Sequence, residues 1–141
     1  MMRTMNHTQP RMLYVMPERK KEKQIVDLCR DLGILPREIK EGEESRAVGV
    51  LAGTIPPELE PKPAKQAPGG YRLPELLVFC GLEDGLLDRF LAEYRQRKIE
   101  PTGLKAVMTP HNLFWPVYEL AEELRQEQAA MQMARRSREG Q

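Results

Sequence analysis

Two continuous apolar runs stand out along the chain, MLYVM at residues 12–16 and LLVFC at residues 76–80. A short run without polar positions is typical of a β-strand that is buried on both faces. Two further stretches, REIKE at 37–41 and LKAVM at 104–108, contain charged residues. We therefore expect four strands, with the two apolar strands at the centre of a sheet and the two mixed strands at its edges.

The apolar residues that follow each central run are spaced for helices. Pro17 and Glu18 suit the first turn of a helix, and Gly33 suits the left-handed residue that ends it. The helical stripe between them comprises Ile25, Leu28, Cys29 and Leu32. A second helix is expected after Asp84, which is a suitable N-cap. Its stripe comprises Leu86, Leu87, Phe90, Leu91 and Tyr94.

Two further segments are predicted to be helical. The last helix is expected from about Leu113 to about Ala130, which places Pro116 in its first turn. Its buried face comprises Val117, Leu120, Ala121 and Leu124. Residues 45–53, SRAVGVLAG, fit a short helix capped by Ser45, and they also fit a strand.

A proline-rich segment separates two similar halves of the chain. Residues 54–75 contain six prolines and the pair Gly69-Gly70, which predicts a flexible linker and no regular element. The expected organisation is a loose N-terminus (1–10), a first half (11–53), the linker (54–75), a second half (76–130) and a basic tail (131–141).

Each half has the element order strand, helix, strand, helix, which is typical of an α/β fold. The sheet order predicted from the central and edge strands is 2-1-3-4. A doubly wound parallel sheet has this feature, and we prefer it. A ferredoxin-like sheet also centres the first and third strands, and in that alternative we expect these two strands to be antiparallel.

Composition indicates one small domain. The chain has 141 residues, with 22 lysines and arginines against 21 acidic residues and a net charge of +1. This balance disfavours a dedicated nucleic-acid-binding protein. No apolar run approaches the length of a membrane span, and the N-terminus lacks the apolar core of a signal peptide. Cys29 and Cys80 are expected to be free thiols, so we predict a cytoplasmic protein.

The segment TPHN at 109–112 is the first candidate site. Thr109 and Asn112 suit capping and turn roles, which would fully occupy their side chains. Lys105 lies between apolar neighbours and requires water, a carboxylate or a ligand. The functional hypothesis is that Lys105, Thr109 and Asn112 bind a polar or anionic ligand at the edge of the sheet. The alternative is an exposed edge-strand lysine beside a helix cap.

Cys80 is the second candidate, because a thiol between a strand and a helix N-terminus can have a lowered pKa. The neighbouring Glu83 and Asp84 oppose that effect, and a buried inert thiol is the preferred interpretation. His111 has no partner residues at the spacing of a catalytic triad. His7 is expected in a loose segment, so we predict no metal site, and no phosphate-loop motif or cofactor signature is present.

The C-terminal half resembles a known bacterial family, domain of unknown function 3783. The residues that carry the resemblance have the pattern LKAxxTxxNxxW and are Leu104, Lys105, Ala106, Thr109, Asn112 and Trp115. The similarity extends from residue 76 to about residue 124. It implies a small bacterial cytoplasmic protein, and it implies no activity, cofactor or catalytic residue.

These observations favour a non-enzymatic binding or regulatory module. Its partner would be an unidentified small molecule or a protein, and a homodimer is one option. One alternative is a thiol-dependent enzyme or redox protein that uses Cys80. Another is weak nucleic-acid binding by the basic C-terminal tail, although the charge balance disfavours it.

Overall fold

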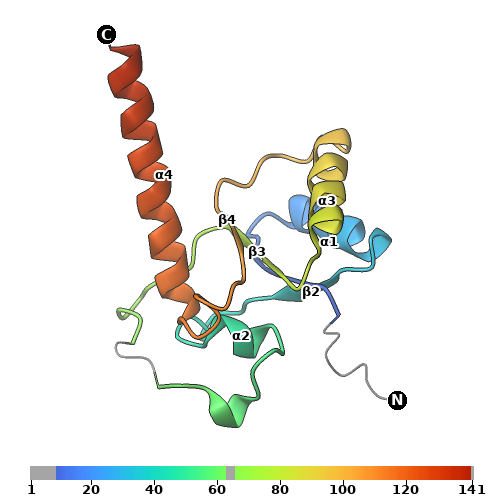
Figure 1. Cartoon of the computed structure of the whole chain (residues 1–141), viewed down its shortest axis with the longest axis vertical. Helices are drawn as coiled ribbons and strands as arrows, with labels where there is room; N and C mark the ends of the chain where they lie inside the picture. Colours follow the sequence, from blue (N-terminus) through green and yellow to red (C-terminus); the bar gives the residue numbers. More distant parts are fainter. Residues whose placement is uncertain (1–8, 63–65, 141) are drawn as a thin grey trace.

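A computed structural model describes residues 9–62 and 66–140 (Figure 1). The N-terminal half contains β1 (Arg11–Val15), α1 (Arg19–Asp31), β2 (Leu35–Glu38) and the single turn of α2 (Val48–Leu51). The C-terminal half contains β3 (Leu76–Cys80), α3 (Asp84–Gln96), β4 (Lys105–Val107) and the long helix α4 (Val117–Glu139). A short 3-10 helix, η2 (Pro57–Leu59), lies between the halves. The two halves therefore have the same element order.

The sheet has the predicted strand order, β2-β1-β3-β4. Within each half the two strands are parallel, as a strand-helix-strand unit requires, whereas β1 and β3 are antiparallel. The α/β class and the strand order are therefore confirmed, and the wholly parallel direction is wrong. The ferredoxin-like alternative correctly included an antiparallel central pair, but here both edge strands run parallel to their neighbours.

The connection between the halves explains the mixed direction of the sheet. A parallel β3 would require a crossover that returns the chain to the end of the sheet where β1 begins. Residues 45–53 supply only one helical turn, Val48–Leu51, which is too short for that purpose. The chain re-enters the sheet at Leu76, opposite Val15, where β1 ends. Thus β3 begins beside the end of β1 and runs in the opposite direction.

Apolar side chains fill both faces of the two central strands. On one face, α1 and α3 cover a cluster that includes Met12, Leu77, Phe79 and Phe90. On the other face, α2 and the beginning of α4 cover Leu13, Leu76, Val78 and Val117. Figure 1 shows these helices on opposite sides of the sheet. The apolar runs of β1 and β3 are thus explained by burial on both sides, as predicted.

An approximate two-fold relation links the halves. Four backbone hydrogen bonds join them reciprocally: Val48 N to Trp115 O (2.9 Å), Val117 N to Arg46 O (2.9 Å), Gly49 N to Leu113 O (2.7 Å) and Tyr118 N to Glu44 O (3.0 Å). Both α1 and α3 are followed by a residue with positive φ, Gly33 (75°) and Lys98 (56°). A buried isoleucine follows each of them, Ile34 and Ile99. The pairing of α2 with the beginning of α4 thus closes the fold symmetrically.

Several predicted boundaries need correction. The last helix begins at Val117, and Pro116 is its N-cap residue, so the helix does not begin near Leu113. It continues to Glu139, so the predicted basic tail is helical over most of its length. Ser45 does not cap α2, because its hydroxyl accepts a hydrogen bond from Ala67 N at 3.1 Å.

The linker also contains more structure than predicted. Residues 57–59 form η2, contrary to the expectation of no regular element. The carboxylate of Glu60 accepts hydrogen bonds from Arg46 Nε at 3.0 Å and from Ala47 N at 2.7 Å, which attaches the linker to the N-terminus of α2. The predicted loose segment 1–10 lies largely outside the described residues, as does His7.

Candidate functional site

The TPHN segment forms a self-contained polar turn. The side-chain oxygen of Asn112 accepts a hydrogen bond from Thr109 N at 2.9 Å, and its amide donates to Val107 O at 3.1 Å. The hydroxyl of Thr109 accepts from the backbone N–H groups of His111 and Asn112, both at 3.2 Å. Asn112 is buried. These two side chains therefore stabilise the end of β4, and neither caps α4.

Lys105 does not join this turn. Its ammonium donates to Thr102 O at 3.2 Å, on the side where β4 begins, whereas Thr109 and Asn112 follow the end of the strand. The alternation of β4 agrees with the prediction, because Leu104, Ala106 and Met108 pack in the core and Lys105 is exposed. The structure thus brings together Thr109 and Asn112 and leaves Lys105 apart from them.

Replacing Asn112 with alanine is expected to destabilise the fold by about 1–2 kcal/mol, because Thr109 N and Val107 O would lose their partners in a largely buried turn. Lys105→Ala is the control on the same strand and should change stability little, since its side chain is exposed. Urea unfolding would measure both. Equal stability of the two variants would contradict the structural role of the turn.

The two cysteines are packing residues of the central core. Both thiols are free and buried, and burial raises the pKa of each to about 12. A nucleophilic or redox-active cysteine needs the opposite shift, because the thiolate is the reactive form. Cys80 also lies at the end of a fully buried strand, where a substrate has no direct access. This geometry offers no support for thiol chemistry at Cys80.

His111 is exposed at the surface of the turn. Its ring packs edge-on against Trp115, with the ring centroids 5.2 Å apart. Trp115 in turn packs against the core on the α2 side of the sheet. His111 thus covers part of an aromatic ring, and the structure gives it no acid–base partner within the described part of the chain.

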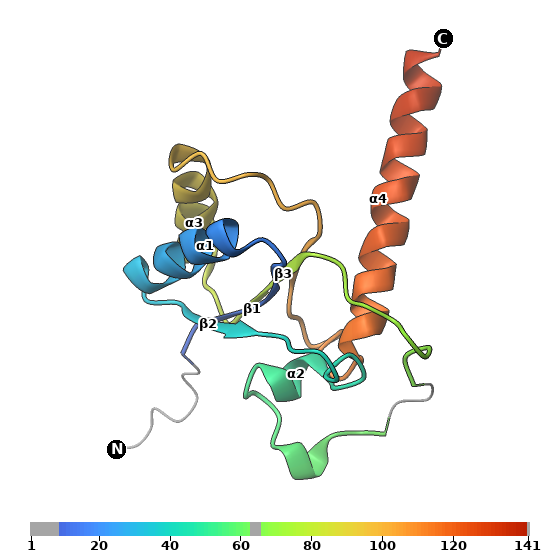
Figure 2. The same cartoon turned by 180° about the vertical axis from the view of Figure 1, so that it is seen from behind.

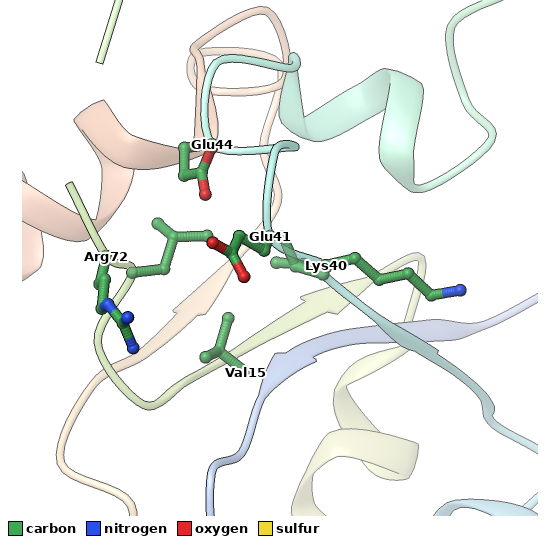
Figure 3. A pocket seen from close by; sticks show the side chains of 7 residues that line it. Val15, Lys40, Glu41, Glu44 and Arg72 are labelled. Carbon is green, nitrogen blue, oxygen red and sulfur yellow. The ribbon is translucent and has the colours of Figure 1, made fainter. Parts of the chain in front are cut away.

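A small pocket lies where β1 and β2 end, at the edge where α/β folds commonly bind ligands (Figure 3). The lining residues are Val15, Ile39, Lys40, Glu41, Glu44, Arg72 and Leu73. The sequence reasoning did not identify them, because they come from a turn after an edge strand and from the proline-rich segment. No motif links these two segments; only the fold brings them together.

The full length of the C-terminal helix is the second feature that the sequence did not predict, because the helix was expected to end near Ala130. Both Figure 1 and Figure 2 show α4 projecting well beyond the sheet and the other helices. Every residue from Arg125 to Glu139, a segment that we call the arm, is exposed. Between Val117 and Glu139 the sequence has neither glycine nor proline and is rich in strong helix formers, which is the signal that could have predicted its length.

A groove separates the arm from the loop that precedes β4. It is lined by Gly103, Leu104, Lys105, Leu124, Glu127, Gln128, Met131, Gln132 and Arg135. Lys105 thus faces the arm and not the polar turn. Within the described residues, no helix is both long enough and apolar enough to cross a membrane.

These features define a small α/β domain of two related halves with a projecting C-terminal helix. Residues 75–131 match the family described as Domain of unknown function (DUF3783), which confirms the resemblance expected from the sequence. The match begins one residue before β3 and ends within the arm. Comparisons with curated proteins and with solved structures gave no match.

Proposed function

We propose that this protein is a non-enzymatic binding module that associates through its arm with a second copy of the chain. The observation that carries the proposal is the asymmetry between the halves. The single turn of α2 is sufficient to close the N-terminal half, whereas α4 continues through the exposed arm. The family resemblance gives the proposal its setting, a bacterial cytoplasmic protein.

The arm exceeds what the fold itself requires. The residues of α4 that are buried are Val117, Tyr118, Leu120 and Ala121, all near its N-terminal end. Isolated helices of about 12–15 residues are only marginally stable in water, and most helices gain their stability from packing. The arm has this length and no buried side chain. A partner that packs along it would supply the missing stabilisation.

The sequence of the arm is complementary to itself in an antiparallel arrangement. Its central residues, AMQMA at 130–134, read the same in both directions about Gln132. A two-fold axis at Gln132 places Met131 of one copy at the same level as Met133 of the other, and Arg125 at the same level as Glu139. Arg125, Gln132 and Glu139, each seven residues apart, share one face of α4, and Met131 and Met133 flank that face on its two sides.

The exposed methionines border the facing side of the arm and would supply its hydrophobic contribution at the edges of the contact. Met131 and Met133 are 62% and 68% exposed, and burying a methionine side chain contributes about 1.5–3 kcal/mol. Methionine also adapts to an irregular packing surface, because its side chain is unbranched and flexible. The arm pairs Arg125 with Glu122 at 3.0 Å within one chain, an exposed pair that is too weak to prevent a new partner.

The test is the oligomeric state of the full chain, measured by size-exclusion chromatography with light scattering over a range of concentrations. We expect a dimer that becomes a monomer when Met131 and Met133 are both replaced by lysine. Arg125→Glu and Glu139→Arg should each weaken the dimer, and the double variant should restore it. Arg89→Glu, an equal charge change at an exposed site on α3, should have no effect.

Two results would overturn the proposal. One is a full chain that remains monomeric at the highest concentration reached. The other is a dimer that persists unchanged in the double lysine variant, because its interface would then lie elsewhere on the molecule. Circular dichroism of each variant would establish that the fold is retained.

A further inference from the structure

The pocket at the ends of β1 and β2 has an apolar floor. Val15 and Ile39 come from the two strand ends, and Leu73 comes from the segment that leads into β3. Ile39 is buried, and its backbone N–H donates to Tyr14 O at 2.8 Å, which fixes the end of β2 against β1. The floor is therefore part of the folded core and is already formed without a ligand.

Opposite charges surround this floor. Glu41, Glu44 and Arg72 line the pocket, and Figure 3 shows Glu41 and Arg72 approaching the same space from two different segments. Lys40 also lines the pocket, but its side chain extends away from that space (Figure 3). Within residues 9–62 and 66–140, neither Glu41 nor Arg72 forms an ion pair. Their charges are available to a ligand.

The turn that carries the acidic residues is held in place. Glu43 accepts hydrogen bonds from Arg37 at 2.6 Å and from Lys40 N at 2.8 Å. Glu44 accepts from Gly42 N at 2.9 Å through its carboxylate and from Tyr118 N at 3.0 Å through its backbone oxygen. Because the turn is already ordered, less conformational entropy is lost when a ligand binds.

The segment that carries Arg72 is anchored as well. The hydroxyl of the preceding residue, Tyr71, donates to Glu122 on α4 at 2.7 Å, and its ring packs edge-on against Tyr118. Glu41, Glu44 and Arg72 also line an adjoining hollow bounded by Gln66, Ala67, Pro68 and Gly70. The same three charged residues therefore line two neighbouring depressions.

We propose that this pocket binds a small zwitterion with an aliphatic group, such as an aliphatic α-amino acid. Glu41 and Glu44 would accept hydrogen bonds from its ammonium group, and Arg72 would donate to its carboxylate. The aliphatic side chain would cover Val15, Ile39 and Leu73. This site is separate from the arm, so its occupancy does not depend on the proposed dimer.

The experiment is a titration of the full chain with L-leucine, followed by calorimetry and by amide chemical shifts in NMR spectra. We expect saturable binding with shifts at the pocket residues. 4-Methylpentanoate lacks the ammonium group and 3-methylbutylamine lacks the carboxylate, so each should bind at least about tenfold more weakly, as expected when a charge-assisted contact is lost.

Variants of the lining residues locate the site. Glu41→Gln and Arg72→Gln should each weaken L-leucine binding by about tenfold or more. Lys40→Gln is the matched control and should leave it unchanged, because Lys40 points away from the pocket. Absence of L-leucine binding at millimolar concentrations would overturn the proposal, as would binding that is equally strong in the Glu41 and Arg72 variants.

Discussion

Replacing Glu75 with alanine is expected to destabilise the fold by about 3–5 kcal/mol, because it leaves a buried lysine without its counter-charge. The ammonium of Lys21 donates to Glu75 at 2.6 Å and to Pro101 O at 2.9 Å. The Lys21 side chain is only 8% exposed, whereas that of Glu75 is 31% exposed. This contact ties α1 to the beginning of β3 and to the loop after α3. It therefore holds the two halves together.

Because the Lys21 side chain is more buried than that of Glu75, replacing Lys21 and replacing Glu75 should destabilise the fold by different amounts. Lys21→Met removes the buried charge and leaves Glu75 able to reach water, so it should cost less than Glu75→Ala. The double variant should be more stable than Glu75→Ala alone, because no unpaired charge remains in the interior. Urea unfolding of the three variants measures these free energies.

A surface ion pair provides the control for this double-mutant cycle of Lys21 and Glu75. Lys23 and Asp27 form an exposed pair on α1 at 2.8 Å, and Asp27→Ala should change stability little. If Lys21→Met proved more damaging than Glu75→Ala, the contribution of Lys21 would have to lie in the packing of its aliphatic chain and not in the burial of its charge.

The fold was predictable as far as burial determines it. The apolar runs at 12–16 and 76–80 identified the central strands, and mixed polarity identified the edges, so the order 2-1-3-4 followed. Strand direction did not follow, because burial on both faces is the same for parallel and antiparallel neighbours. Direction depends on how the chain between residues 39 and 75 returns to the sheet, and that path depends on the single turn Val48–Leu51.

The candidate site was predictable only in part. The sequence predicted a turn at Thr109, and in the structure Thr109 and Asn112 form hydrogen bonds with each other's backbone and with the end of β4. The expectation that Asn112 caps the last helix is wrong, because Pro116 is the N-cap residue of α4. The sequence spacing of Thr109 and Asn112 alone does not distinguish a turn from a ligand site, since both use the same side-chain groups. Lys105 could not be placed, because its neighbours on α4 depend on a helix whose length was underestimated.

The cluster of Glu41, Glu44 and Arg72 could not be predicted from the sequence. Glu41 and Glu44 lie in a turn after an edge strand, where acidic residues are ordinarily solvated. Arg72 belongs to a proline-rich segment that resembles a simple spacer. The cluster forms because β1 and β3 are antiparallel, which brings residue 72 back to the carboxyl ends of β1 and β2.

Gly49→Ala is expected to destabilise the fold by about 2–4 kcal/mol at the contact between the halves. A Cβ atom at Gly49 would lie 2.6 Å from Ile55 Cδ1 and 2.9 Å from the backbone oxygen of Leu113. The side chain of Ile55 is buried and has little room to move. Overpacking of this kind costs about 1–3 kcal/mol, and movement of Leu113 would also weaken its 2.7 Å hydrogen bond with Gly49 N.

Gly85→Ala provides the matched control, since it makes the same chemical change in α3 where a Cβ atom meets nothing within 4 Å. Alanine there should stabilise the fold by about 0.4–1 kcal/mol, because it restricts the unfolded chain and favours helix. Opposite signs for the two variants in urea unfolding would support close backbone contact as the requirement at residue 49. A stabilising Gly49→Ala would mean that the backbone pairing of Val48 and Gly49 with the segment before α4 is looser than the structure describes. The two halves would then be held together mainly by the β1–β3 pair and by the Lys21–Glu75 contact.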